Sequence, residues 1–269
     1  MEAEHKILPM TKVVDIRQMP EEVKAASPYL AEPEISTALQ LGEYICKNKG
    51  TFPPDLLKIT EEKNNLTELC LKHLRLNEEG IKHLSVVLYF LKSLKFANFH
   101  DMQLEPKDLA VLSPAIAKLS NLEEINFTAN NIGPGCKHLS LAIGHLSKLI
   151  ILDLTDCSLR AGHMTTLSSD IKKLTKLELL KLSFNHIEDY GCDALCKIIP
   201  EMPLLVEIEL FTCGITNISY KCLENAFKNS NLHSVLLGNN QFTPKFEGKL
   251  KKAFPFVHFG IKHYRCNIF

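Results

Sequence analysis

The chain has 269 residues, its 31 Lys and Arg residues are balanced by 31 Asp and Glu residues, and 45 % of its residues are hydrophobic. This composition is typical of a globular protein of one or two domains, and it excludes disordered, fibrous and collagen-like classes. Because neither sign of charge is in excess, nucleic acid and anionic membrane surfaces are disfavoured as partners.

The amino-terminal part of the chain is predicted to be a helical cap. Its first ten residues carry acids where an export signal needs positive charge, and the apolar runs of the chain fall short of the roughly 20 residues of a membrane span. Helical spacing follows between residues 20 and 50, and Gly50 and the pair Pro53-Pro54 end it. We assign residues 1–60 to an N-terminal helical capping segment and expect a cytoplasmic protein.

One apolar phrase then recurs along the chain at intervals of about 27–28 residues. Its pattern is L-x-x-L-x-L-x-x-N/C-x-L, and its first positions are Leu66, Leu94, Leu122, Leu149, Leu177, Leu205 and Leu232. The apolar fourth and sixth positions alternate with period 2, which predicts a short strand with one buried face. Helical spacing follows each phrase, so each unit is predicted to be a strand followed by a helix.

The units are expected to stack, since one unit has too little core to fold alone. We predict an α/β leucine-rich repeat solenoid, or horseshoe, with a parallel sheet on the concave face and helices on the convex face. Residues 61–254 form its seven repeats, each of about 27–28 residues. Four glycines are predicted to stand just before the helices, where the chain turns tightly: Gly80, Gly135, Gly162 and Gly191. After Pro255, alternating apolar residues predict a C-terminal cap strand within residues 255–269.

From Leu66 to about Phe254, this pattern resembles the leucine-rich repeat family, and specifically its ribonuclease-inhibitor-like subclass. The ninth position of the phrase alternates as in that subclass, reading Asn130, Cys157, Asn185, Cys213 and Asn240, whereas the first two units depart with Leu74 and Met102. This residue is expected to point inward at the bend after the strand and to bond backbone groups that lack ladder partners. The resemblance implies a module for protein–protein interaction, because similar repeats serve as inhibitors, sensors and scaffolds.

The sequence contains no standard motif for catalysis, for phosphate binding or for a metal site. Phosphate loops, H-E-x-x-H, G-x-S-x-G and C-x-x-C are all absent from it. Nine cysteines, an odd number, are spread singly, which favours a reducing compartment over a disulfide framework. Cys192 and Cys196 lie four apart on a predicted helix, and we interpret them as core thiols. We predict no catalytic, cofactor-binding or metal-binding residues and a chain that is not an enzyme.

Strand alternation places the third, fifth and seventh positions of each phrase on the concave face. Ile151 and Leu179 are neighbours there and Phe211 lies one unit further, which predicts an apolar centre; singly exposed apolar residues that only support strand pairing are the alternative. The centre is bordered by acids, with Lys181 as the cation in the middle. The predicted partner-binding residues are Phe96, Glu124, Ile151, Asp153, Leu179, Lys181, Glu207, Glu209 and Phe211.

An apolar centre bordered by charges is the anatomy of a protein interface. The leading hypothesis is therefore a non-catalytic module that binds another protein through its concave face, as an inhibitor, a sensor or an effector-type adaptor. The partner is expected to carry a basic and partly apolar surface. Two alternatives stay open, an enzyme-associated regulatory subunit and the ligand-sensing segment of a larger innate-immune-type receptor. Neither nucleic acid nor a membrane is expected as a partner, and the oligomeric state is left open.

Overall fold

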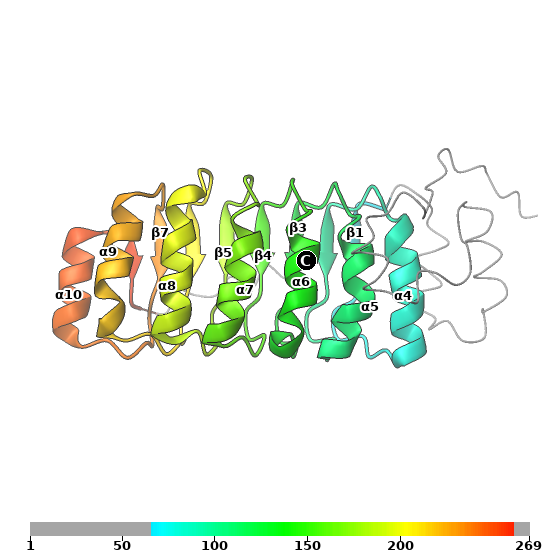
Figure 1. The fold of residues 1–269 in the computed structure, drawn as a ribbon, viewed down its shortest axis with the longest axis horizontal. Coiled ribbons are helices and arrows are strands. Elements are labelled where there is room, and N and C mark those ends of the chain that lie inside the picture. Colours follow the sequence, from blue (N-terminus) through cyan, green and yellow to red (C-terminus); the bar gives the residue numbers. More distant parts are fainter. Residues whose placement is uncertain (1–65, 261–269) are drawn as a thin grey trace, which may run out of the picture.

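The computed structural model describes residues 66–260, so the predicted helical cap at residues 1–60 and the end of the closing strand lie outside the described residues. Within residues 66–260, eight strands pair in chain order into one parallel sheet (Figure 1). The strands are β1 (Glu68–Cys70), β2 (Phe96–Asn98), β3 (Glu124–Asn126), β4 (Ile151–Asp153), β5 (Leu179–Lys181), β6 (Glu207–Glu209), β7 (Ser234–Leu236) and β8 (Val257–His258).

One helix follows each of the first seven strands and lies in a second layer over one face of the sheet (Figure 1). The helices are α4 (Glu78–Phe90), α5 (Pro106–Ile116), α6 (Cys136–Ile143), α7 (Ala161–Ile171), α8 (Glu188–Ile198), α9 (Tyr220–Lys228) and α10 (Pro244–Ala253). Short 3-10 turns flank three of them: η3 (Gly133–Gly135), η4 (Ile199–Glu201) and η5 (Asn217–Ser219). None of the helices within residues 66–260 is long and apolar enough to span a membrane.

The strand register is the one that the repeat predicts. Third positions pair with third positions and fifth with fifth, as in Ile151 with Leu179 and Asp153 with Lys181. Neighbouring strands lie about 4.8 Å apart, whereas packed helices need about 8–10 Å between their axes. This difference in spacing puts the sheet on the concave side of the solenoid and the helices on the convex side.

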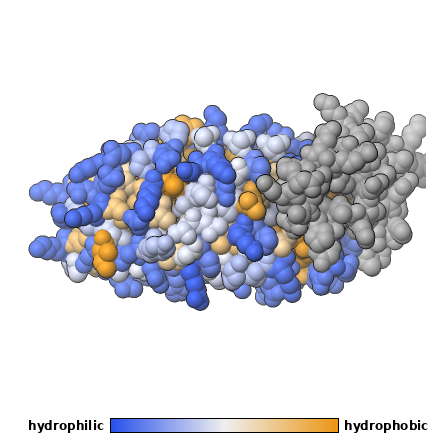
Figure 2. Space-filling view, viewed as in Figure 1, coloured by the Kyte–Doolittle hydropathy of each residue, from blue (hydrophilic) through white to orange (hydrophobic). Residues whose placement is uncertain are grey.

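The core lies between the two layers. The fourth and sixth positions of the phrase are buried throughout the array, and in the central repeats their exposure is zero, as for Leu152 and Leu154. The apolar side of each helix closes the core from the other layer, with Leu139 and Ile143 on α6 and Leu195 on α8. The outer side of the helices is largely hydrophilic, with small separate apolar areas (Figure 2).

From the third repeat to the seventh, ninth-position side chains form a hydrogen-bonded ladder at the bend after the strand. Asn185 donates to the carbonyl oxygens of Leu154 and Leu182, each at 2.8 Å, and accepts from the backbone N–H groups of Cys157 and Leu159. Asn240 makes the same four kinds of bond two repeats further along the chain. Cys157 and Cys213 supply a thiol donor in the alternate repeats. The inward orientation predicted for these residues is confirmed, and it satisfies backbone groups that the short strands leave over.

The residue before this ladder has a left-handed backbone in all seven repeats. The eighth positions are His73, Asp101, Ala129, Asp156, Phe184, Thr212 and Asn239, with φ between 48° and 62°. This conformation is uncommon for residues other than glycine. The N–H of the eighth residue bonds the seventh carbonyl oxygen of the next repeat, as Asp156 bonds Ser183 at 2.9 Å, and the left-handed φ turns the chain that follows away from the strand direction.

The predicted role of the helix glycines is wrong for three of them. Gly80, Gly162 and Gly191 lie inside the first turn of their helices, which begin before them in the chain. Gly135 alone of the four precedes its helix. At Gly191 a Cβ atom would stand 2.8 Å from Ile187 Cγ2 and 3.1 Å from Ala161 Cα, so the absence of a side chain allows close packing of adjacent repeats.

Candidate functional site

The concave face is formed by the third, fifth and seventh positions of the repeats. Along β3 to β6 the third and fifth positions are half-buried, on either side of a fully buried fourth position. Because the strands are so short, each repeat contributes two strand side chains to this face. The face is therefore a narrow band that runs across the strands, perpendicular to their direction.

The centre of the concave face is apolar. Ile151 of β4 and Leu179 of β5 are paired in register, so their side chains stand beside each other. Phe96 lies further along the same row, on β2, and is 38 % exposed. Between Phe96 and Ile151 the row is interrupted by Glu124 of β3.

The prediction of Phe211 as an exposed anchor is wrong. Its side chain is only 8 % exposed, and its ring lies over Gly238 of the next repeat, where a Cβ atom would stand 2.9 Å from the ring. The ring also meets that of Phe184 edge to face at 5.5 Å between centroids. Gly238 occupies the same repeat position as Phe211. Because Gly238 has no side chain, the ring of Phe211 fills the space that a side chain would take there.

Acidic side chains border this centre. Lys181 Nζ lies 3.8 Å from Asp153 Oδ2, so the central cation is shared with the acid beside it in register. Burial raises the pKa of the Glu124 carboxyl, while Lys181 lowers it to a smaller extent and Asp153 raises it. On the other side, Glu207 accepts a hydrogen bond from Ser234 Oγ at 2.8 Å. The band is acidic on both sides of the Ile151–Leu179 pair.

The fifth-position side chains also have a structural role. Asn98, Asn126 and Asp153 each use Oδ1 to accept a hydrogen bond from the backbone N–H two residues later, at 2.8–3.0 Å. This bond holds the end of the strand. In Asp153 the second carboxylate oxygen remains for Lys181, so the ion pair and the backbone hydrogen bond use different oxygen atoms.

Sequence reasoning missed two features at the bend. Asp101 accepts from His73 Nδ1 at 2.8 Å and from Arg75 Nη2 at 3.0 Å, which joins the first two repeats at the surface. Phe184 is 42 % exposed beside the buried Phe211. His73, Asp101 and Phe184 all occupy the eighth position of their repeats. The regular recurrence of this position after every strand is the sequence signal that could have located them at the bend.

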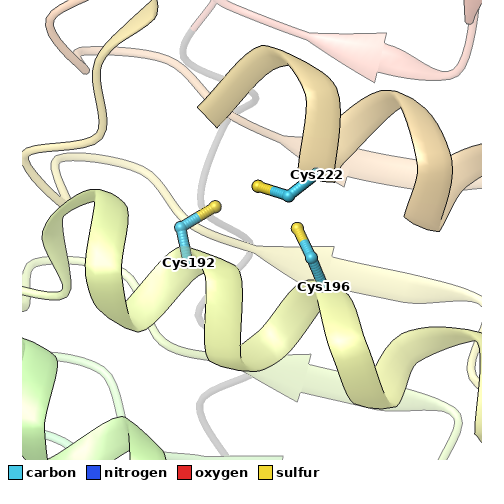
Figure 3. Close-up of side chains that lie close together, drawn as sticks. All are labelled: Cys192, Cys196 and Cys222. Atoms are coloured by element: carbon cyan, nitrogen blue, oxygen red, sulfur yellow. The ribbon is translucent and has the colours of Figure 1, made fainter. Parts of the chain in front are cut away.

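A group of three thiols lies in the helix layer, away from the concave face. Cys192 and Cys196 of α8 are buried, as predicted, and Cys222 of α9 points toward them (Figure 3). The three sulfur atoms all lie within 4.8 Å of one another. Hydrogen bonds from Cys192 and Cys196 lower the pKa of the Cys222 thiol. The pKa of the Cys196 thiol is raised by its hydrogen bonds with Cys192 and Cys222 and by burial. The approach of Cys222 was missed because it belongs to the next repeat and stands almost a full repeat length from Cys196 in the sequence.

The chain is similar in sequence to proteins whose names include LRR domains. No family model matches the chain. It is 26 % identical over 240 residues to mouse NACHT, LRR and PYD domains-containing protein 4E, and 28 % identical over 217 residues to human NACHT, LRR and PYD domains-containing protein 5. These matches cover 81 % and 78 % of this chain but only 24 % and 18 % of the relatives. The fold is a leucine-rich repeat solenoid.

A further relative of the solenoid is NLR family CARD domain-containing protein 4 of Xenopus tropicalis, 27 % identical over 66 % of this chain and 19 % of the relative. The chain thus spans about a quarter or less of the length of these curated relatives. Among solved structures, the actin-binding site 2 of leiomodin-1 aligns with a TM-score of 0.44 and 12 % identity, over 53 % of this chain and 85 % of that one. An internalin from Listeria monocytogenes aligns with a TM-score of 0.37 and 15 % identity, over 78 % and 72 % of the two chains.

Proposed function

We propose that the solenoid is a non-catalytic module that binds a partner protein through its concave face. The observation that carries this proposal is the pair of half-buried apolar side chains, Ile151 and Leu179, which stand in register on an open sheet face between acidic residues. Apolar residues at the centre of a patch supply most of the binding energy in protein interfaces, and the surrounding polar residues supply specificity.

The charges indicate what kind of surface fits. Glu124, Asp153, Glu207 and Glu209 outnumber Lys181 on the band, and Lys181 lies next to Asp153. A partner with basic residues around a small apolar patch matches this pattern. Its charges accelerate encounter and its apolar contacts slow dissociation. Phe96 extends the contact along the row, and Phe211 packs over Gly238 of the next repeat on the same face.

Two finer statements belong to the same proposal. We infer a repeat of the ribonuclease-inhibitor-like subclass, because the units have about 27–28 residues, carry α-helices on the convex side and alternate Asn with Cys at the ninth position. We also infer that the module works in the cytoplasm, as the sensing segment of a larger receptor. This inference is supported by relatives whose names combine LRR with NACHT and PYD domains.

The test compares two matched substitutions on opposite faces. Leu179→Lys replaces an apolar side chain of the concave face by a cation, and the neighbouring Glu207 accommodates the new charge. Leu141→Lys makes the same change on α6, where the side chain is 55 % exposed. Both variants are first compared with the unmodified chain by circular dichroism and thermal unfolding. All three are then used as baits in cytosol, and bound proteins are quantified by mass spectrometry.

The expected result is a protein that the unmodified chain and Leu141→Lys retain and that Leu179→Lys loses by at least about tenfold, equal to about 1.4 kcal/mol. That protein, once purified, should bind more weakly as the salt concentration rises, because the band is acidic. Equal retention by all three baits would refute the assignment of the concave face. Loss with Leu141→Lys alone would move the binding surface to the helices.

A further inference from the structure

The three thiols of α8 and α9 form an arrangement that the protein-binding proposal does not use. Cys192 and Cys196 are one helical turn apart on α8, with exposures of 0 % and 5 %, and Cys222 in the first turn of α9 is half-buried. All three side chains point into the same space between the two helices (Figure 3). Their Sγ atoms lie within 4.8 Å of one another, although they come from two adjacent repeats.

We propose that Cys192, Cys196 and Cys222 form a three-thiolate binding site for a thiophilic metal ion such as Zn²⁺. Zinc binds thiolates at about 2.3 Å, so two sulfurs of a tetrahedral site are about 3.8 Å apart. The observed separations exceed this value by at most about 1 Å. Rotation of the cysteine side chains closes such a gap without movement of the helices, and all three sulfurs already converge.

The chemistry of the donor set favours soft ions. Sulfur is the donor atom at all three positions, and thiolates select Zn²⁺ or Cu⁺ over Mg²⁺ and Ca²⁺, which prefer oxygen. Three protein ligands leave a fourth position, which water can occupy from the side of Cys222, the solvent-reaching member of the group. Binding is balanced by loss of the thiol protons to solvent, one for each thiol that becomes a ligand.

The position of Cys222 suits a thiolate. It is the third residue of α9, in the amino-terminal turn, where the helix dipole favours negative charge. In the structure its thiol donates to the carbonyl oxygen of Ser219 at 3.1 Å. Loss of that proton gives up one weak bond, and the metal replaces it. A bound ion would join the fifth and sixth repeats, so it would stabilise their interface.

The test is a titration of the full chain, reduced and freed of metal with a chelator, with Cd²⁺ and then with Zn²⁺. Cadmium reports thiolate binding through its sulfur-to-metal charge-transfer absorbance, and calorimetry gives the affinity of both ions. The test variant is Cys222→Ser. The matched control is Cys136→Ser, because Cys136 is also a thiol in the first turn of its helix, but it lies outside the group. Circular dichroism checks that both variants are folded.

The expected stoichiometry is one ion per chain, with an affinity that falls more than about 100-fold in Cys222→Ser and is unchanged in Cys136→Ser, because even partners outside the coordination shell change metal affinity by about 10–100-fold. If Cys222→Ser fails to fold, alkylation of the unmodified chain replaces it, and zinc should protect Cys222 from the reagent. Equal affinity in both variants, or alkylation of Cys222 at the same rate with and without zinc, would overturn the site. So would a fully reduced, metal-free chain that takes up neither ion.

Discussion

The asparagine ladder makes Asn185 the polar residue whose removal should harm the fold most. Its side chain is 2 % exposed and bonds five backbone groups, three carbonyls and the N–H groups of Cys157 and Leu159. In Asn185→Ala all five lose this partner, and the buried position keeps water from replacing it. An unsatisfied buried group costs about 1–3 kcal/mol, and the two N–H groups both donate to the same atom, Asn185 Oδ1.

These values predict a loss of about 4 kcal/mol in the free energy of unfolding for Asn185→Ala. That loss is a large part of the roughly 5–15 kcal/mol of a typical domain. The control is Asn126→Ala, at a half-buried position of the concave face where one hydrogen bond from Thr128 is lost, for an expected cost of about 1 kcal/mol. Asn185→Cys should fall between the two, since a thiol keeps a donor, as in Cys157, but loses the acceptor.

Urea unfolding followed by far-ultraviolet circular dichroism measures these differences. A loss of stability with an unchanged denaturant slope would place the whole effect in the native array. A lower slope would show that the repeats on either side of Asn185 unfold separately, as the nearest-neighbour energetics of repeat proteins allow. Equal losses for Asn185→Ala and Asn126→Ala would refute the reasoning, because the ladder would then contribute no more than one surface hydrogen bond.

Three further predictions concern the core, the helix packing and the response to pH. Leu152→Asp should unfold the array by burying an unpaired charge, whereas Asp153→Asn should keep the fold, because Oδ1 still accepts the backbone hydrogen bond. Asp153→Asn should instead slow the association with the partner. Urea unfolding and association kinetics separate the two effects, and an unfolded Asp153→Asn would contradict the register. At Gly162 a new Cβ would meet nothing within 4 Å apart from its chain neighbours and the backbone of its own helix, so Gly162→Ala should raise the stability by about 0.5–1 kcal/mol. Gly191→Ala should lower the stability by about 1–3 kcal/mol, and thermal unfolding that gave the same sign for both variants would refute the packing argument. Burial raises the pKa of Asp189, but hydrogen bonds from Ser219 and Thr216 outweigh it and leave the pKa lowered. The ionised Asp189 therefore stabilises the fold above about pH 4, the ordinary range of Asp, and this stabilisation is lost as the pH falls further. Asp189→Asn should flatten the fall in stability toward acidic pH, and an unchanged pH profile would exclude this role.

The sequence predicted the candidate site only in part. It identified the concave positions because side chains alternate between the two faces of a strand, so the register of the phrase assigns each residue to a face, as it did for Ile151 and Leu179. It failed for Phe211, which has the correct face but a buried side chain. Its burial depends on Gly238 in the next repeat, and a pattern that treats each repeat alone carries no information about which neighbour fills a space.

The repeat by itself determined the strand–helix unit, the parallel register and the inward direction of the ninth position, because each follows from local periodicity. Only the tertiary structure decided which residues from different repeats meet. The left-handed eighth position is an example, since the residues there include Phe184 and Thr212, which have no local preference for that backbone and adopt it at the bend between the strand and the buried ninth position. The meeting of Cys222 with Cys192 and Cys196 is another, because the distance between two helices is set by the packing of whole repeats and not by the sequence of either one.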